Sequence, residues 1–190
     1  MKFTQAALHG IWVIESEQHA DERGYFMRVF CEREFEAHGL PHRFVQSSLS
    51  SNPRVGTLRG LHFQWPPSRE GKLVRCLSGA VYDVMVDARP SSPTFLQHFG
   101  VELSERSGRA VYIPEGFLHG FQVIEEGARV LYQMTDFFAA DLGDGFRYDD
   151  PAFGVRWPLP VSVVSERDKA APAFDVKRYR EEFTRREGRA

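Results

Sequence analysis

The sequence predicts a mainly β protein, an antiparallel β-barrel of the jelly-roll type with a few short helices. Short apolar or alternating segments recur along the chain, turn residues separate them at intervals typical of antiparallel barrels, and helical periodicity is scarce. The 190 residues are 42% hydrophobic, which is enough for one core. We therefore expect a single domain over residues 1–190, with a barrel core at about 40–160 and a helical tail at about 172–190.

A series of segments has the apolar pattern and the β-branched or aromatic residues that favour strands. In chain order they are 11–15, 25–30, 73–76, 81–87, 97–103, 110–113, 121–124 and 129–135. A further strand is expected around His62, because its neighbour Phe63 is apolar and β-prone. Turn-forming residues separate these segments, as at 89–93, 107–108, 114–116 and 126–127.

Helix is expected at two places. Residues 32–38 can form a short helix before Gly39, and residues 176–186 are a charged candidate with apolar positions at Val176, Tyr179 and Phe183. We expect the second segment to be a surface helix or a contact for a partner.

Charge and composition exclude several classes of function. The formal net charge is −2 and the pI about 6.4, with acids and bases interspersed, so the chain lacks a broad basic field for nucleic acid or anionic membranes. No apolar run approaches the roughly 18 residues of a membrane span, and the N-terminal residues lack the apolar region of a signal peptide. Cys31 and Cys76 have no CxxC spacing and lie among hydrophobic residues, which is typical of reduced thiols. We expect a cytoplasmic protein.

Residues 58–64 (LRGLHFQ), with Lys72 ten residues after His62, form the most informative segment. An imidazole shielded inside a barrel can be held neutral and ready to accept a proton. Cations such as Arg59 and Lys72 can stabilise the oxyanion that forms when a proton is removed next to a carbonyl. A lone histidine on a barrel strand is usually a satisfied core residue, and the nearby cations favour a catalytic role here.

Residues 60–64 (GLHFQ) and 114–119 (PEGFLH) resemble the paired motifs of the cupin barrels. Metal-binding cupins usually have a His-x-His pair and a following Glu, whereas this chain has Gln64 at the second position. Only His62 and His119 remain as good ligands, fewer than the three protein ligands typical of catalytic zinc or iron. We therefore expect neither a metal nor another cofactor, and a metal-dependent cupin oxygenase remains a rival interpretation.

Longer motifs over about residues 10–172 resemble those of the dTDP-4-dehydrorhamnose 3,5-epimerases. They are 21–26 (DERGYF), 58–64 (LRGLHFQ), 71–75 (GKLVR), 113–121 (IPEGFLHGF), Leu131-Tyr132 with Thr135-Asp136, and 165–168 (SERD). The resemblance implies cofactor-independent epimerisation at C3 and C5 of a nucleoside diphosphate 4-keto-6-deoxyhexose. The expected reaction converts dTDP-4-dehydro-6-deoxy-D-glucose into dTDP-4-dehydro-L-rhamnose through an enolate, a step in dTDP-rhamnose and cell-surface polysaccharide biosynthesis.

The resemblance also implies roles for four catalytic residues. His62 is the base, and Asp168 is the carboxylate partner that fixes its tautomer and stabilises the imidazolium. Tyr132 is the proton donor on the opposite face of the sugar, and Lys72 neutralises the oxyanion at O4. Judged from the residues alone, Tyr132 could be an ordinary strand aromatic and Asp168 could cap a C-terminal turn.

A substrate-binding set follows from the same resemblance. Its members are Arg23, Phe26, Gln46, Ser48, Arg59, Lys72, His119, Phe138 and Arg167. The three arginines form a diphosphate set, although each could equally be a solvated surface charge, and His119 could contact the sugar or pack at the barrel mouth. In the family, Arg23 and Phe26 reach the site of a partner subunit, which implies a homodimer with exchanged N-terminal strands.

Departures from the family pattern concentrate where the nucleotide is expected. Arg28 replaces an acidic residue, Ser48 replaces Asn, Phe138 replaces Tyr, and Gly143 with Asp144 occupies the region of another expected acid. Phe138 can still stack on a base. One alternative is therefore a CDP- or GDP-linked keto sugar, or inversion at C3 or C5 alone. A non-catalytic cupin that binds a sugar nucleotide is the alternative from another class.

Overall fold

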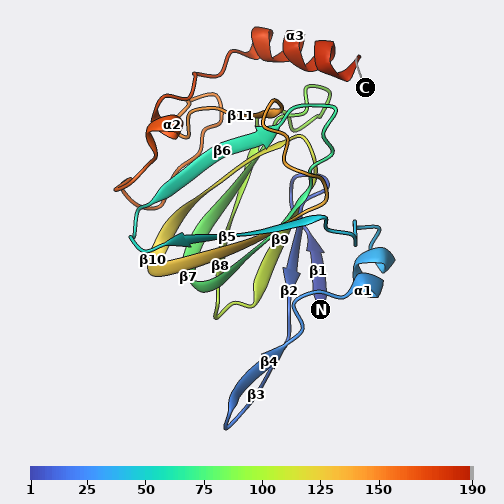
Figure 1. Cartoon of the computed structure of the whole chain (residues 1–190), viewed down its shortest axis with the longest axis vertical. Coiled ribbons are helices and arrows are strands. Elements are labelled where there is room, and N and C mark those ends of the chain that lie inside the picture. Colours follow the sequence, from blue (N-terminus) through green and yellow to red (C-terminus); the bar gives the residue numbers. More distant parts are fainter. Residues whose placement is uncertain (189–190) are drawn as a thin grey trace.

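The computed structural model describes residues 1–188, so positions 189 and 190 of the expected tail lie outside the described residues (Figure 1). One nine-stranded antiparallel sheet curls into a barrel, and a two-stranded hairpin projects from it. The sheet strands are β1 (Lys2–Gln5), β2 (Trp12–Glu15), β5 (Gln46–Asn52), β6 (Leu58–Gln64), β7 (Lys72–Asp87), β8 (His98–Ser104), β9 (Arg109–Ile113), β10 (Phe117–Met134) and β11 (Gly143–Gly145). The predicted antiparallel, mainly β fold class is confirmed.

Two long strands, β7 and β10, run through both halves of the barrel. The first residues of β7 pair with β9 and with the end of β10, and its last residues pair with β8 and with the start of β10. Gly79 lies where β7 changes partners, at φ +63°, and an added Cβ would come within 2.8 Å of the Glu126 carbonyl oxygen. Glycine is therefore required at this bend. The sequence predicted two strands in place of each long one, because such bulges resemble turns.

Several strands escaped the sequence-based prediction. The missed ones are β1, β3 (Gln18–Asp21), β5 and β11, and the strand expected at 25–30 is the shorter β4 (Gly24–Met27). Strand β5 has the sequence QSSLSSN, which lacks the apolar alternation of a half-buried strand. It is held by its register against β10, from Gln46 opposite Met134 to Asn52 opposite Ala128.

Side chains along β6 alternate between an outer aromatic cluster and the barrel interior. Leu61 and Phe63 point outward into an aromatic cluster that includes Tyr179 and Phe183. Because successive strand residues point to opposite faces, His62 and Gln64 face the barrel interior. That interior is filled at its centre by a second cluster, which includes Val74, Met85, Phe121 and Val130.

Three helices lie within residues 1–188. Helix α1 (Glu32–Ala37) and helix α3 (Val176–Glu187) match the two expected, and the single-turn α2 (Glu166–Lys169) was missed. Helix α3 is a surface helix, as expected, and packs on the barrel through the buried Tyr179 and Phe183 (Figure 1). None of the described helices is long and apolar enough to cross a membrane. Both cysteines are free thiols.

Candidate active site

His62 and Asp168, 106 residues apart in the chain, meet at the inner face of β6. The His62 Nε2 atom lies 2.7 Å from Asp168 Oδ1, and the other carboxylate oxygen accepts from the Gly60 N–H at 3.3 Å. Asp168 is buried in α2, whose N-cap is Ser165, and the Ser165 hydroxyl accepts from the Asp168 N–H at 3.1 Å. The Asp168 carboxylate is thus engaged with His62, and capping is the task of Ser165.

This contact determines the imidazole tautomer. A carboxylate can only accept a hydrogen bond, so in the neutral imidazole of His62 the Nε2 atom carries the proton and Nδ1 has the lone pair. The His62 side chain is 46% exposed, which corrects the expectation of a shielded imidazole. The ring lies in the barrel opening, where β6 ends, and can exchange protons with water.

Tyr132 and His119 lie together on the interior face of β10. The His119 Nε2 atom is 2.8 Å from Asp83 Oδ1, and both residues are buried. The Tyr132 ring meets the His119 ring edge-on, with centroids 6.0 Å apart. Burial raises the pKa of Tyr132 far above its ordinary value, and the negative charge of Asp83 adds to the shift. The phenol is therefore protonated at neutral pH and able to donate.

His62 and Tyr132 are both neighbours of His119. His62 is the cross-strand neighbour of His119, and Tyr132 packs against that same His119 ring. On the other side, Ser48 of β5 is the cross-strand neighbour of Tyr132. The structure thus gathers His62, His119, Tyr132 and Ser48 around one part of the barrel interior.

Two cations predicted for the site, Arg59 and Lys72, are each held by a polar side chain. Arg59 donates from Nε to the Oδ1 of Asn52 at 2.6 Å, and the buried Asn52 amide donates in turn to backbone carbonyls of Ser50 and Ala128. The Lys72 ammonium lies 2.6 Å from the Glu70 carboxylate. Sequence reasoning missed Asn52, Glu70 and Asp83, because an isolated polar residue carries no local pattern that reveals its partner.

Gln46 and Phe138 meet where the end of β10 leaves the barrel. The Phe138 N–H donates to Gln46 Oε1 at 2.6 Å, and the Phe138 ring is 61% exposed. An added Cβ at Gly143 would lie 3.1 Å from this ring, so glycine leaves room for the ring in this position. An exposed flat aromatic beside an amide is suited to stacking on a base.

Other predicted residues are not brought to this interior within the single chain. Arg23 and Phe26 lie on the β3–β4 hairpin, which projects away from the barrel (Figure 1). There Arg23 pairs with Asp21, and Phe26 is 73% exposed. Arg167 is exposed on α2, and Arg28 pairs with Glu34 of α1.

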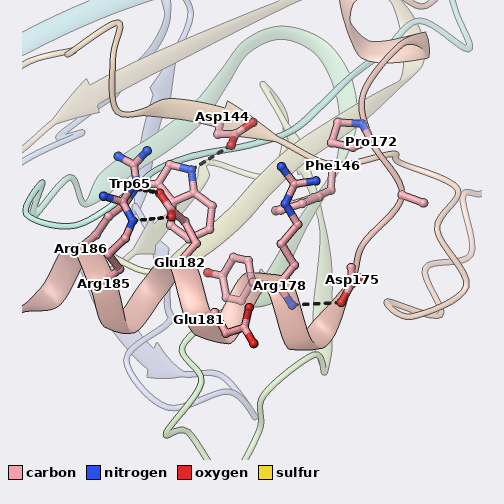
Figure 2. Close-up of a pocket in the computed structure, with 12 residues that line it drawn as sticks. Trp65, Asp144, Phe146, Pro172, Asp175, Arg178, Glu181, Glu182, Arg185 and Arg186 are labelled. Atoms are coloured by element: carbon pink, nitrogen blue, oxygen red, sulfur yellow. Dashed lines mark hydrogen bonds and ion pairs between the residues drawn. The ribbon is translucent and has the colours of Figure 1, made fainter.

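A pocket of about 660 Å³ lies beneath α3, on the opposite face of the barrel wall (Figure 2). Trp65 donates to Asp144 at 2.8 Å on its floor, and Glu182 pairs with two arginines of α3 at its rim. Its lining, among residues 1–188, includes none of the predicted site residues. The same part of the chain holds no group of three or more His, Cys, Asp or Glu side chains arranged for a metal ion.

Comparisons with known sequences agree on one family. Residues 5–175 match the family model described as dTDP-4-dehydrorhamnose 3,5-epimerase. The chain is 42% identical over 176 residues to the dTDP-4-dehydrorhamnose 3,5-epimerase of Pseudomonas aeruginosa, which covers 92% of this chain and 96% of the relative.

Solved structures extend this similarity to the fold. A Legionella pneumophila dTDP-6-deoxy-D-glucose-3,5-epimerase in complex with dTDP-4-keto-L-rhamnose matches with a TM-score of 0.86 and 38% identity, over 93% of this chain and 95% of that one. A 3'-monoepimerase from Streptomyces bikiniensis in complex with dTDP-quinovose matches with a TM-score of 0.83 and 26% identity, over 95% and 97%.

Proposed function

The chain belongs to the dTDP-4-dehydrorhamnose 3,5-epimerase family, and we propose that it inverts C3 and C5 of a dTDP-linked 4-keto-6-deoxyhexose. It is an isomerase with the cupin fold of that family. The observation that carries the proposal is the His62–Asp168 pair in the same barrel as the partly buried Tyr132, whose raised pKa keeps it protonated. These are the two partners that proton removal and proton return on opposite faces require.

In the proposed first step, His62 acts as the base. Its Nδ1 lone pair accepts the proton from C3 or C5, the C–H bond breaks, and the electron pair moves through the C4 carbonyl to O4 as an enolate. The Asp168 carboxylate balances the charge of the new imidazolium through Nε2. Because the His62 side chain is half-exposed, it can pass the proton on to solvent.

In the second step, Tyr132 returns a proton to the opposite face of the same carbon. The enolate electrons form the new C–H bond, the C4 carbonyl is restored, and the tyrosinate is reprotonated from water. The raised pKa of the phenol keeps it neutral until the enolate forms. The two steps consume no oxidant or reductant.

Cations complete the proposed site. Lys72 neutralises the negative charge that develops at O4, which is the main electrostatic demand of an enolate mechanism. Arg59, held by Asn52, contacts the diphosphate, and His119 contacts the sugar. Gln46, Ser48 and Phe138 receive the nucleotide, with the Phe138 ring stacked on the base.

The functional unit we propose is a homodimer with exchanged N-terminal hairpins. In one chain Arg23 and Phe26 are exposed and far from the barrel interior, which suits residues that serve a partner's site (Figure 1). Arg23 would then join Arg59 and Arg167 on the diphosphate.

Inversion at one carbon alone is a second candidate. It is favoured by the similarity to a 3'-monoepimerase, whose fold matches nearly as well as that of a 3,5-epimerase. The two candidates share the base and the enolate, and they differ in how often the sugar is reprotonated before release.

The substrate assignment is tested by turnover of one 4-keto-6-deoxyglucose carried on dTDP, CDP or GDP. We expect kcat/KM to be highest for the dTDP-linked sugar, because Gln46 and the Phe138 ring lie together where the base would stack. Faster turnover of the CDP- or GDP-linked sugar would instead show that the replacements at Arg28 and Ser48 changed the nucleotide preference.

A further inference from the structure

We infer that Glu70 is a positioning residue that holds the Lys72 ammonium in a fixed place in the barrel. This inference rests on the proposed function, in which Lys72 meets the enolate oxygen. Glu70 contacts Lys72 rather than the reacting atoms, so it acts through the lysine. Neither the family motifs nor the chain's similarity to other epimerases assigned Glu70 a role.

Lys72 and Glu70 form an ion pair that is largely buried. The Lys72 Nζ atom lies 2.6 Å from Glu70 Oε2, and the two side chains are only 16% and 8% exposed. Placing a lone ammonium in such surroundings is costly, since it loses most of its hydration. A carboxylate at hydrogen-bond distance offsets that cost, whereas removing one partner leaves the other charge buried and unpaired.

The backbone that carries Glu70 is held by hydrogen bonds to Thr135. Between the two side chains, the Gly71 N–H donates to the Thr135 hydroxyl at 2.7 Å, and the Thr135 N–H donates back to the Gly71 carbonyl at 3.0 Å. The Thr135 hydroxyl also donates to the Arg69 carbonyl at 3.0 Å. An added Cβ at Gly71 would lie 2.7 Å from the Tyr112 hydroxyl, so only glycine fits this clamp. The carboxylate therefore projects from a fixed point.

Lys72 needs a partner that orders its side chain. Its four-carbon stem is flexible, and ordering it during the reaction would raise the barrier. A partner on a clamped backbone orders the stem when the protein folds, so the ammonium already lies in place when the enolate forms. Such preorganised charge lowers the barrier because it needs no rearrangement when the enolate forms.

The test begins with Glu70→Gln, which keeps the length and a hydrogen-bonding amide oxygen but removes the charge. We expect kcat to fall about 10-fold or more, since misplaced catalytic groups cost up to on the order of 100-fold, while KM changes little. Glu15→Gln is the matched control, because Glu15 also pairs with cations but at the opposite end of β9. Equal kcat values for Glu70→Gln and wild type would overturn the inference.

A double-mutant cycle separates positioning from a general effect on folding. If Glu70 acts through Lys72, Glu70→Gln should cause no further loss in a Lys72→Ala background. A full further loss there would show that Glu70 acts elsewhere.

A readout independent of turnover covers the case in which Lys72→Ala is too slow to measure. With lysine labelled with ¹⁵N, we expect the Lys72 ammonium signal, assigned with Lys72→Arg, to shift or broaden in Glu70→Gln and to stay unchanged in Glu15→Gln. An unchanged signal in Glu70→Gln contradicts the inference. An inactive wild type would contradict the proposed function, whereas this signal would still report on the Glu70–Lys72 pair alone.

Discussion

At the scale of single residues, the contact between His62 and Asp168 determines which nitrogen can accept a proton. Asp168 accepts from Nε2 at 2.7 Å and also receives the Gly60 N–H, so the carboxylate is oriented by two donors. An amide in its place could present an NH₂ group to the imidazole and stabilise the other tautomer. The Nδ1 atom would then carry the proton and could not act as the base.

The first prediction concerns Asp168→Asn. We expect kcat to fall about 100-fold or more, by analogy with the loss of tautomer control in catalytic triads. The measurement is the steady-state rate with dTDP-4-keto-6-deoxyglucose, and the control is Asp149→Asn, whose carboxylate pairs with Arg147 at the surface. A kcat within twofold of wild type would mean that the carboxylate does not control the base.

The second prediction concerns Tyr132→Phe, which removes the proposed acid and leaves the base. Inversion should be strongly impaired, while His62 continues to exchange substrate protons with solvent. Deuterium incorporation and product formation can be followed in the same sample by NMR. Equal loss of both processes would show instead that Tyr132 mainly positions the sugar.

Sequence motifs point to the four proposed catalytic residues but not to the side chains that hold them. His62, Lys72, Tyr132 and Asp168 occur in motifs with fixed neighbours, and the 106-residue separation of His62 from Asp168 was bridged only by the family resemblance. Asp83 lies in an ordinary apolar strand, and its role follows from the register that places it beside β10. Such pairings depend on tertiary contacts that one strand's sequence does not contain.

At the scale of elements, strand existence was more predictable than strand continuity. The centres of β7 and β10 were anticipated as separate strands, because Gly79 and Gly127 interrupt the apolar pattern. In the structure both strands continue across bulges, since pairing with neighbouring strands on each side of the bend satisfies the hydrogen-bonding groups of the backbone. Strand β5 was missed because its sequence, QSSLSSN, is mostly polar and lacks apolar alternation.

The third prediction concerns the turn between β7 and β8. The buried Asp87 carboxylate accepts from Arg89, Ser92 and Thr94. Burial opposes its charge, but the hydrogen bonds from these partners outweigh burial and lower the pKa of Asp87. Asp87→Ala should lower the free energy of unfolding by about 3 kcal/mol, because it leaves buried donors and a cation without their acceptor. Urea unfolding at neutral pH measures this loss.

The pH dependence of this stabilisation has a defined sign. Because the pKa of Asp87 is lower in the folded state than in the unfolded state, its contribution is present above the unfolded pKa of about 4 and is lost as the pH falls through the folded pKa. Between about pH 5 and about pH 2, wild type should therefore lose more stability than Asp87→Ala. Parallel losses in the two proteins would contradict this assignment.

At the scale of the whole molecule, the projecting β3–β4 hairpin is the feature that a single barrel does not explain (Figure 1). Its exposed aromatic residues, Tyr25 and Phe26, are large apolar side chains at the surface. Arg75 ties the end of this arm to the barrel by donating to the Val29 carbonyl at 2.9 Å. An anchored arm with exposed aromatic side chains on β4 is suited to contact a second copy of the chain.

The fourth prediction is complementation between two inactive variants. Arg23→Ala should lose diphosphate binding and His62→Ala should lose the base, so each homodimer should be nearly inactive. If the arm serves the partner's site, a mixed dimer contains one site with both lesions and one site with neither. Unfolding and refolding an equal mixture should then restore about one quarter of the sites. No recovery, with mixed dimers demonstrated by differential tags, would contradict arm exchange.

In the proposed reaction, one enolate mechanism inverts the two carbons next to the C4 carbonyl. The most direct measurement is to incubate the protein with dTDP-4-keto-6-deoxyglucose in deuterium oxide and to follow the C3 and C5 proton signals by NMR. We predict that both signals disappear with wild type and that neither does so with His62→Ala. Loss of the C3 signal alone would indicate a monoepimerase, and persistence of both signals with wild type would contradict the account.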